Sequence, residues 1–131
     1  MKFCPKSLEQ LVSTIFHCAG SHQQEADLIA QHLVKANLVG HDSHGVIRTP
    51  IYIRWLREGN VFVNRSIEVT FDSPSLALAD GQFGYGQSVA HQAVDLGIRK
   101  CRQQGAAVIG LRNSGHVGRV GCVVVLWLCW P

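Results

Sequence analysis

A chain of 131 residues is long enough for one compact domain with a hydrophobic core, and too short for two. Its 47% apolar and 16% charged residues are typical of a globular protein and exclude a disordered one. The net charge is +3, and the twelve Lys and Arg are scattered among nine acidic residues. A nucleic-acid surface needs a clustered basic stripe, so we expect no nucleic-acid partner.

The chain ends and the cysteines favour a cytoplasmic protein. The N-terminal sequence, MKFCPKSLEQLVST, has no apolar segment of signal-peptide length. The long apolar run at 122–131 is about half of the roughly twenty residues that a membrane helix needs, so we expect no membrane span. The cysteines are odd in number, widely spaced and without a C-x-x-C pair, which favours reduced thiols over disulfides. They are Cys4, Cys18, Cys101, Cys122 and Cys129.

Two amphipathic helices are predicted at the start of the chain. An apolar stripe at helical spacing predicts the first helix over 8–19. The second begins at Ser21, where Gln24 completes a capping box, and ends at Gly40. The short turn between them predicts that the two helices pack as a hairpin. The stripe of the first helix consists of Leu8, Leu11, Val12, Ile15 and Phe16.

The hydrophobic pattern later changes to a period of two residues. Alternation over 67–72 predicts a half-buried strand, and a second strand follows from Leu76 to Gly81. The glycine-rich sequence GQFGYGQ then forms a turn that leads into a helix over about 86–104. The sequence AAVIGL, at 106–111, predicts a fully buried strand. Helices followed by a ββαβ segment predict a mixed α/β (α+β) fold.

A first candidate site lies in the sequence GHDSHGVIRTPIY, within a third helical stretch at roughly 45–58. Pro50 is tolerated there if it lies near the first turn or marks a kink. If the helix extends back to His44, that residue shares one face with Arg48 and Tyr52. An arginine can hold a carboxylate with two parallel hydrogen bonds, and a histidine can exchange a proton near neutral pH.

Another face of this helix carries Ile47, Ile51 and Trp55, so the helix could bury that side and present the polar residues to a cleft. The alternative is a solvated helix face, because polar pairs at this spacing are common on exposed helices.

A second candidate site is the sequence NSGHVGRVG at 113–121. It follows a predicted buried strand, and ligand sites in α/β sheets favour the carboxyl ends of strands. Glycines let the main chain approach a ligand closely, and His116 among them is a candidate general acid or base. The alternative is a glycine-rich turn in which His116 only makes local hydrogen bonds.

Other kinds of site do not match the sequence. The spacing Gly115-x-x-Gly118-x-x-Gly121 is not the dinucleotide motif G-x-G-x-x-G, and GQFGYGQ lacks the G-K-[ST] ending of a P-loop. A zinc site could be drawn from His41, His44, His116 and a cysteine, but the paired spacings of structural zinc are absent. We therefore expect no metal.

Two stretches together resemble the N-terminal part of the malate/L-lactate dehydrogenase family. They are ANLVGHDSHGVIRTPIYIRWLREG and GQFGYGQSVAHQAVDLGIRKCRQQGAAVIGLRNSGHVGRVG. The likeness runs from about residue 7 to Gly121, and D-S-H-G followed by N-S-x-H-x-G-R is specific. The resemblance implies a truncated form of the family's non-Rossmann L-2-hydroxycarboxylate dehydrogenase fold, and NAD or NADP as cofactor. It also implies a small 2-hydroxy or 2-keto acid substrate, such as malate or L-lactate, and a homodimer for full-length members.

The resemblance also implies roles for individual residues. His116 would be the residue that transfers the hydroxyl proton, and His44 would face the same substrate. Arg48 would bind the substrate carboxylate, while Ser43 and Tyr52 would shape the pocket. The family's cofactor-binding surface lies mostly in the C-terminal part that this chain lacks, so no cofactor-binding residue is assigned.

The end of the chain departs from the family pattern. Residues 1–121 correspond to the N-terminal part of a dehydrogenase domain, whereas CVVVLWLCWP, at 122–131, replaces an amphipathic helix. We expect this apolar tail to be a product of a frameshift near Gly121, which the other reading frames of the DNA would reveal. The alternative is a buried C-terminal strand. The alternative function is accordingly an inactive fragment with no activity of its own.

Overall fold

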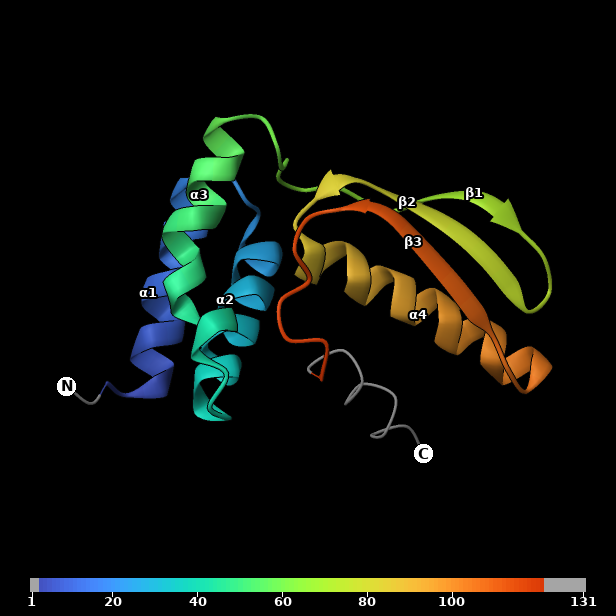
Figure 1. The fold of residues 1–131 in the computed structure, drawn as a ribbon, viewed down its shortest axis with the longest axis horizontal. Helices are drawn as coiled ribbons and strands as arrows, with labels where there is room; N and C mark the ends of the chain where they lie inside the picture. Colours follow the sequence, from blue (N-terminus) through green and yellow to red (C-terminus); the bar gives the residue numbers. More distant parts are fainter. Residues whose placement is uncertain (1–2, 122–131) are drawn as a thin grey trace.

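The computed structural model describes residues 3–121, which form a mixed α/β fold with the predicted order of helices and then a ββαβ segment (Figure 1). Helices α1–α3 group together at one side, and α4 lies along a three-stranded sheet at the other. The elements are α1 (Pro5–Cys18), α2 (Gln23–Leu38), η1 (Asp42–His44), η2 (Val46–Arg48), α3 (Thr49–Arg57), β1 (Glu68–Asp72), β2 (Leu76–Gly84), α4 (Gly86–Gln104) and β3 (Val108–Ser114).

The predicted hairpin of α1 and α2 is present and supplies much of the core. Val12 and Phe16 of α1 are buried with Ile29 and Leu33 of α2. Leu11, by contrast, is 58% exposed, because only one side of the predicted stripe faces α2. A hydrophobic cluster of this kind stabilises helices that would be marginal in isolation.

The predicted capping box at the start of α2 is wrong. The helix begins at Gln23 with His22 as its N-cap residue, and no side chain caps it. The hydroxyl of Ser21 is buried without a hydrogen-bond partner within the described residues. The side chain of Asn64, more than forty positions away, accepts a hydrogen bond from the His22 amide instead (2.7 Å). A tertiary contact has taken the place of the local cap.

The sheet has the order β1-β2-β3, with β1 antiparallel to β2 and β2 parallel to β3 through α4. Burial alternates along β2: the small residues Ala77 and Ala79 are buried, while Leu78 is 47% exposed. A helix can approach a sheet closely where the facing side chains are small.

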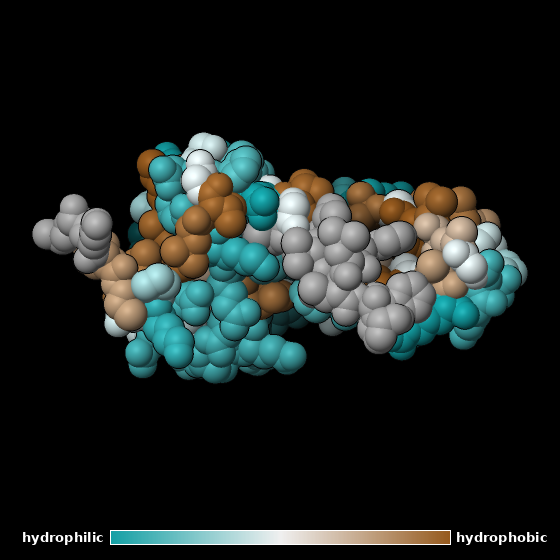
Figure 2. Space-filling model, turned by 90° about the horizontal axis from the view of Figure 1, so that it is seen from below, coloured by the Kyte–Doolittle hydropathy of each residue, from teal (hydrophilic) through white to brown (hydrophobic). Residues whose placement is uncertain are grey.

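Two burial predictions for the sheet are wrong. All five residues of β1 are exposed, and β3 is at most partly buried. The reason is that α4 packs along β2 and β3 on one face of the sheet. Both faces of β1, and the large apolar side chains on the other face of β2, have no cover within residues 3–121. The sheet half of the molecule accordingly shows hydrophobic surface in Figure 2. These exposed side chains include Val69, Phe71, Leu76, Leu78 and Val108.

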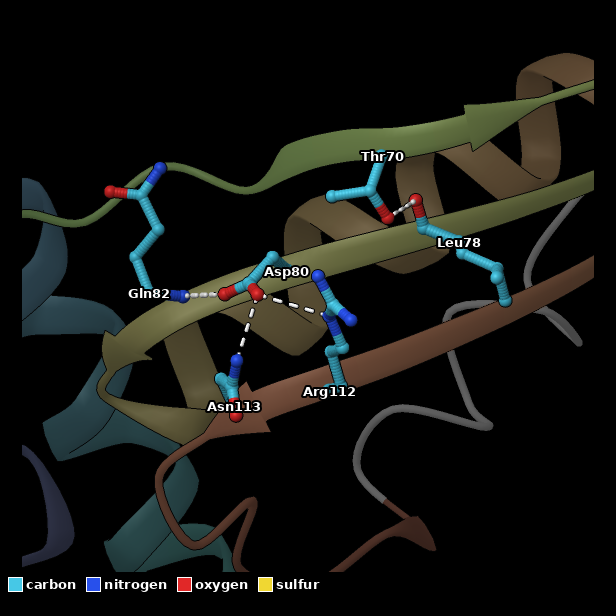
Figure 3. Close-up of polar contacts among 6 residues, drawn as sticks. All are labelled: Thr70, Leu78, Asp80, Gln82, Arg112 and Asn113. Carbon is cyan, nitrogen blue, oxygen red and sulfur yellow. Dashed lines mark hydrogen bonds and ion pairs between the residues drawn. The ribbon is translucent and has the colours of Figure 1, made fainter.

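The carboxylate of Asp80, in the middle of β2, is bonded to residues near the end of β3 (Figure 3). It accepts hydrogen bonds from the Gln82 amide (2.8 Å), from Arg112 Nε (3.0 Å) and from Asn113 Nδ2 (2.8 Å). These bonds, with the Gln82 amide first, lower the pKa of Asp80. The end of β3, from which the next loop leaves the sheet, is therefore fixed to β2.

The predicted tail at 122–131 lies outside the described residues, so its frameshift origin stays a prediction. No helix within residues 3–121 is long and apolar enough to cross a membrane.

Candidate active site

The loop that follows β3 passes directly over the first turn of α4. A Cβ atom on Gly86 would lie 2.3 Å from the Gly115 carbonyl oxygen and 2.4 Å from that of His116. Main chain therefore packs against main chain, which only glycine at position 86 permits. This contact places His116 beside the N-terminal end of α4.

The segment before α3 is not the continuous helix that the sequence predicts. Two short 3-10 helices, η1 and η2, are separated by Gly45, whose backbone is extended. The side chain of Asn37 on α2 holds this break, because its Oδ1 accepts a hydrogen bond from the Val46 amide (2.8 Å). Pro50 lies in the first turn of α3, where a missing amide proton costs nothing.

Burial on this segment is also the reverse of the prediction. Ile47 is 65% exposed, whereas Tyr52 is 1% exposed and belongs to the hydrophobic core. The aromatic ring of Tyr52 packs against Phe16, Trp55 and Tyr85. The phenol is therefore presented by a rigid aromatic cluster rather than by an open helix face.

The structure brings His44, Tyr52 and His116 into one group. The phenol oxygen of Tyr52 lies 2.8 Å from His116 Nδ1. The rings of His44 and His116 are stacked, with centroids 5.5 Å apart and planes at 26°. Residues from two separate elements, η1 and α3, thus contact His116.

Arg48 and Ser43 lie at the rim of this group. Arg48 Nε donates to the Ser43 carbonyl oxygen (2.6 Å), and the Ser43 hydroxyl lies 3.0 Å from His44 Nδ1. Among residues 3–121, Arg48 makes no other hydrogen bond, so the terminal nitrogens of its guanidinium can still donate to a ligand. Ser43 therefore contacts Arg48 through its main chain and His44 through its hydroxyl.

Comparison with known proteins places this arrangement in one family. The sequence profile described as "Malate/L-lactate dehydrogenase" matches residues 3–127. The chain belongs to the malate/L-lactate dehydrogenase family. Hydroxycarboxylate dehydrogenase B of Escherichia coli K12 is 39% identical over 120 residues, which are 92% of this chain and 33% of that protein. The L-sulfolactate dehydrogenase of Methanocaldococcus jannaschii is 34% identical over 89% of this chain and 34% of its own length.

Solved structures of family members have the same fold over this region. Malate dehydrogenase from Pyrococcus horikoshii OT3 superposes with a TM-score of 0.93 at 31% identity, covering 96% of this chain and 36% of that one. Sulfolactate dehydrogenase from M. jannaschii superposes with a TM-score of 0.92 at 33% identity, covering 96% and 37%. The chain therefore spans about a third of the length of the family members that it matches.

Because His116 is partly buried, its ring stays neutral at lower pH than the ring of an exposed histidine does. Burial is the main cause that lowers the pKa of His116 below its ordinary value of 6.5, and repulsion by Arg48 and His44 acts in the same direction. Burial raises the pKa of Tyr52, although the hydrogen bond from Gln87 and the charge of Arg48 oppose this rise. Near neutral pH the pair is therefore a neutral imidazole beside a neutral phenol, which suits exchange of a proton.

Sequence reasoning missed the residues that support this group. Gln87 Nε2 donates to the Tyr52 phenol oxygen (2.9 Å), and Tyr85 is buried against Phe16 with ring centroids 5.5 Å apart. Both lie in the sequence GQFGYGQ. The polar side chain of Gln87 in the first turn of a helix was the one feature that could have indicated such a role. Among residues 3–121, the His, Cys, Asp and Glu side chains form no group of three that could hold a metal ion.

We expect the Arg48→Ala substitution to raise the pKa of His116 toward 6.5, because it removes a nearby positive charge. A ¹H–¹⁵N NMR titration of the ring measures this value. In the unchanged chain the folded state binds the His116 proton less tightly than the unfolded state does. The free energy of unfolding should therefore fall as the pH drops below about 6.5. An unchanged His116 pKa in Arg48→Ala would contradict the electrostatic explanation.

Proposed function

We propose that this chain forms the substrate-binding and proton-transferring part of a 2-hydroxyacid dehydrogenase. The observation that carries the proposal is the position of His116, whose ring is held between Tyr52 and His44 with Arg48 at the rim. The names of the relatives, which include hydroxycarboxylate, malate and L-sulfolactate dehydrogenases, support this substrate class.

Each residue of the group has a part in the proposed reaction. The guanidinium of Arg48 binds the carboxylate of the acid with charge-assisted hydrogen bonds. The hydroxyl proton of the hydroxyacid passes to His116 Nε2. NAD or NADP, when bound, would accept the hydride, so that a keto acid remains. In the reverse direction His116 returns the proton. His44 faces the same substrate, and Ser43 and Tyr52 hold Arg48, His44 and His116 in place.

One candidate for a phosphate cradle for that cofactor is closed. The N-terminus of α4 is the natural candidate, because it follows a glycine-rich turn and helix N-termini bind anions. The main chain of Gly115 and His116 closes this end, as the contact at Gly86 shows. The proposal therefore gives residues 3–121 substrate binding and proton transfer only, with no cofactor-binding residue.

The second candidate function is an inactive fragment. The observation that favours it is that the chain covers only 33% of the length of a matched relative. The two candidates differ in a direct assay. The purified chain, given NADH or NADPH and a panel of 2-keto acids, should oxidise the cofactor if it is an enzyme. Absence of turnover, with His116→Ala indistinguishable from the unchanged chain, would leave the fragment.

Binding of the substrate can be tested without turnover. We expect pyruvate and oxaloacetate to perturb the NMR signals of His44 and His116, and Arg48→Ala to raise the dissociation constant about tenfold or more, since a hydrogen bond to a charged group contributes roughly 1.5–3 kcal/mol. Arg54→Ala, on the exposed side of α3, is the matched control and should leave the dissociation constant unchanged. Equal affinity of both variants would contradict the role of Arg48.

A further inference from the structure

A buried chain of hydrogen bonds runs from α4 through α3 to the loop after β3. Gln87 Nε2 donates to the Tyr52 phenol oxygen at 2.9 Å, and that oxygen lies 2.8 Å from His116 Nδ1. Both Gln87 and Tyr52 are almost completely excluded from solvent, at 0% and 1% exposure. Nothing in the proposed reaction uses Gln87, although it is a fully buried polar side chain in contact with the group.

The protons in this chain can be counted. A phenol has one proton to donate, and its oxygen can accept. Gln87 supplies a proton to the oxygen, so the phenol's own proton must go to an acceptor on His116. Two are within reach, Nδ1 at 2.8 Å and the main-chain oxygen at 3.5 Å. The shorter contact has the usual length of a hydrogen bond, whereas 3.5 Å is long for one between two oxygens.

We infer that Gln87 is a positioning residue: by donating to the Tyr52 phenol, it directs the phenol proton to His116 Nδ1 and keeps the proton of neutral His116 on Nε2. In a neutral imidazole only one nitrogen carries a proton, so an Nδ1 that accepts a hydrogen bond leaves the proton on Nε2. Nε2 makes no hydrogen bond within residues 3–121, so this N–H is available to a substrate oxygen.

The position of Gln87 is fixed from two sides. Its backbone belongs to the first turn of α4, where Gly86 packs on the main chain of Gly115 and His116. The loop also crosses the amide itself, because a Cβ atom on Gly118 would lie 3.1 Å from Gln87 Nε2. Gly118 has a φ of +80°, which a residue with a side chain rarely adopts. The donor and the imidazole it acts on are therefore held by the same loop.

This inference rests on the proposed function for its consequence. A neutral ring that carries its proton on Nε2 donates a hydrogen bond to a keto oxygen, so the resting group is arranged to bind a keto acid. Transfer of a proton in the reduction would start from the doubly protonated ring, so that a neutral imidazole remains. Removal of a hydroxyl proton needs Nε2 empty, and the phenol proton must then turn from Nδ1 to the more distant His116 carbonyl oxygen. Gln87 thus prepares the neutral resting group to bind a keto acid.

The test measures which ring nitrogen carries the proton, by long-range ¹H–¹⁵N NMR of the full chain above the pKa of His116 and without substrate. We expect Nε2 in the unchanged chain. Gln87→Met keeps the length of the side chain but cannot donate, so the phenol oxygen becomes a better acceptor for an Nδ1 proton. The ratio of the Nε2–H form to the Nδ1–H form should fall about threefold or more.

A double-mutant cycle separates this role from a purely structural one. If Gln87 acts through the phenol, Gln87→Met changes the ratio in the unchanged background and has no effect in the Tyr52→Phe background. Gln103→Met, at the exposed end of α4, is the matched control and should leave the ratio unchanged. The inference is overturned if the unchanged chain carries the proton on Nδ1, if Gln87→Met has no effect, or if its effect persists in Tyr52→Phe. Because no substrate is present, these outcomes are independent of the keto-acid binding experiment that tests the proposed function.

Discussion

Phe16→Ala should lower the free energy of unfolding by about 3–5 kcal/mol, the usual cost of removing a buried aromatic ring. Phe16 is fully buried, and its ring packs against both Tyr52 and Tyr85. The cavity would lie directly behind the phenol that contacts His116. We therefore expect this substitution to weaken keto-acid binding even under conditions where the chain stays folded. Urea unfolding followed by circular dichroism measures the stability.

Leu11→Ala is the matched control for this prediction, because Leu11 lies on the same helix but is 58% exposed. Its effect on the free energy of unfolding should stay within about 0.5 kcal/mol, as for most surface substitutions. A similar loss of stability in the two variants would show that α1 contributes through both sides of its apolar stripe, contrary to the arrangement described above.

Gly86→Ala should destabilise the chain by at least about 3 kcal/mol, at the upper end of the cost of overpacking. The added methyl group would meet the carbonyl oxygens of Gly115 and His116 at 2.3 and 2.4 Å, and main chain cannot rotate away as a side chain can. The loop would have to move, and His116 would leave the Tyr52 phenol. Thermal unfolding and the ring-nitrogen signals of His116 report the two effects separately.

Gly97→Ala provides the comparison on the same helix. A Cβ atom there would lie 3.1 Å from Cγ1 of Ile109, a side chain that can adjust. Alanine is also favoured over glycine inside a helix by about 1 kcal/mol. We expect little net change in stability and an unchanged His116 signal. If Gly86→Ala behaved in the same way, the close contact between the loop and α4 would not be a requirement of the fold.

Periodicity was sufficient to predict most of the helices and the three strands, but not the 3-10 helices η1 and η2. The helical hairpin, the helix after GQFGYGQ and the order of the strands follow from the spacing of apolar residues and the positions of glycines. Periodicity was a poor guide to burial, because it shows which side chains share a face but not what covers that face. In β2 the alanines face α4 and the leucines do not, a choice made by the close approach of the helix.

The candidate group shows the same division. The sequence places His44, Arg48 and Tyr52 on one helix face, and this geometric reason for grouping them is wrong. They do not share a helix face, since Gly45 interrupts the segment. Instead, the fold of η1, η2 and α3 around the Asn37 side chain brings His44 and Tyr52 to His116 from different directions.

By itself, the sequence of this chain determined its family, its mixed α/β class and the residues that could carry the chemistry, because these depend on residue types and local spacing. Only the tertiary structure decided that Tyr52 belongs to the core and that Gln87 reaches its phenol. It also decided that the loop carrying His116 rests on Gly86. Each of these contacts joins residues far apart in the chain, and their distances depend on how closely helices, sheet and loop pack.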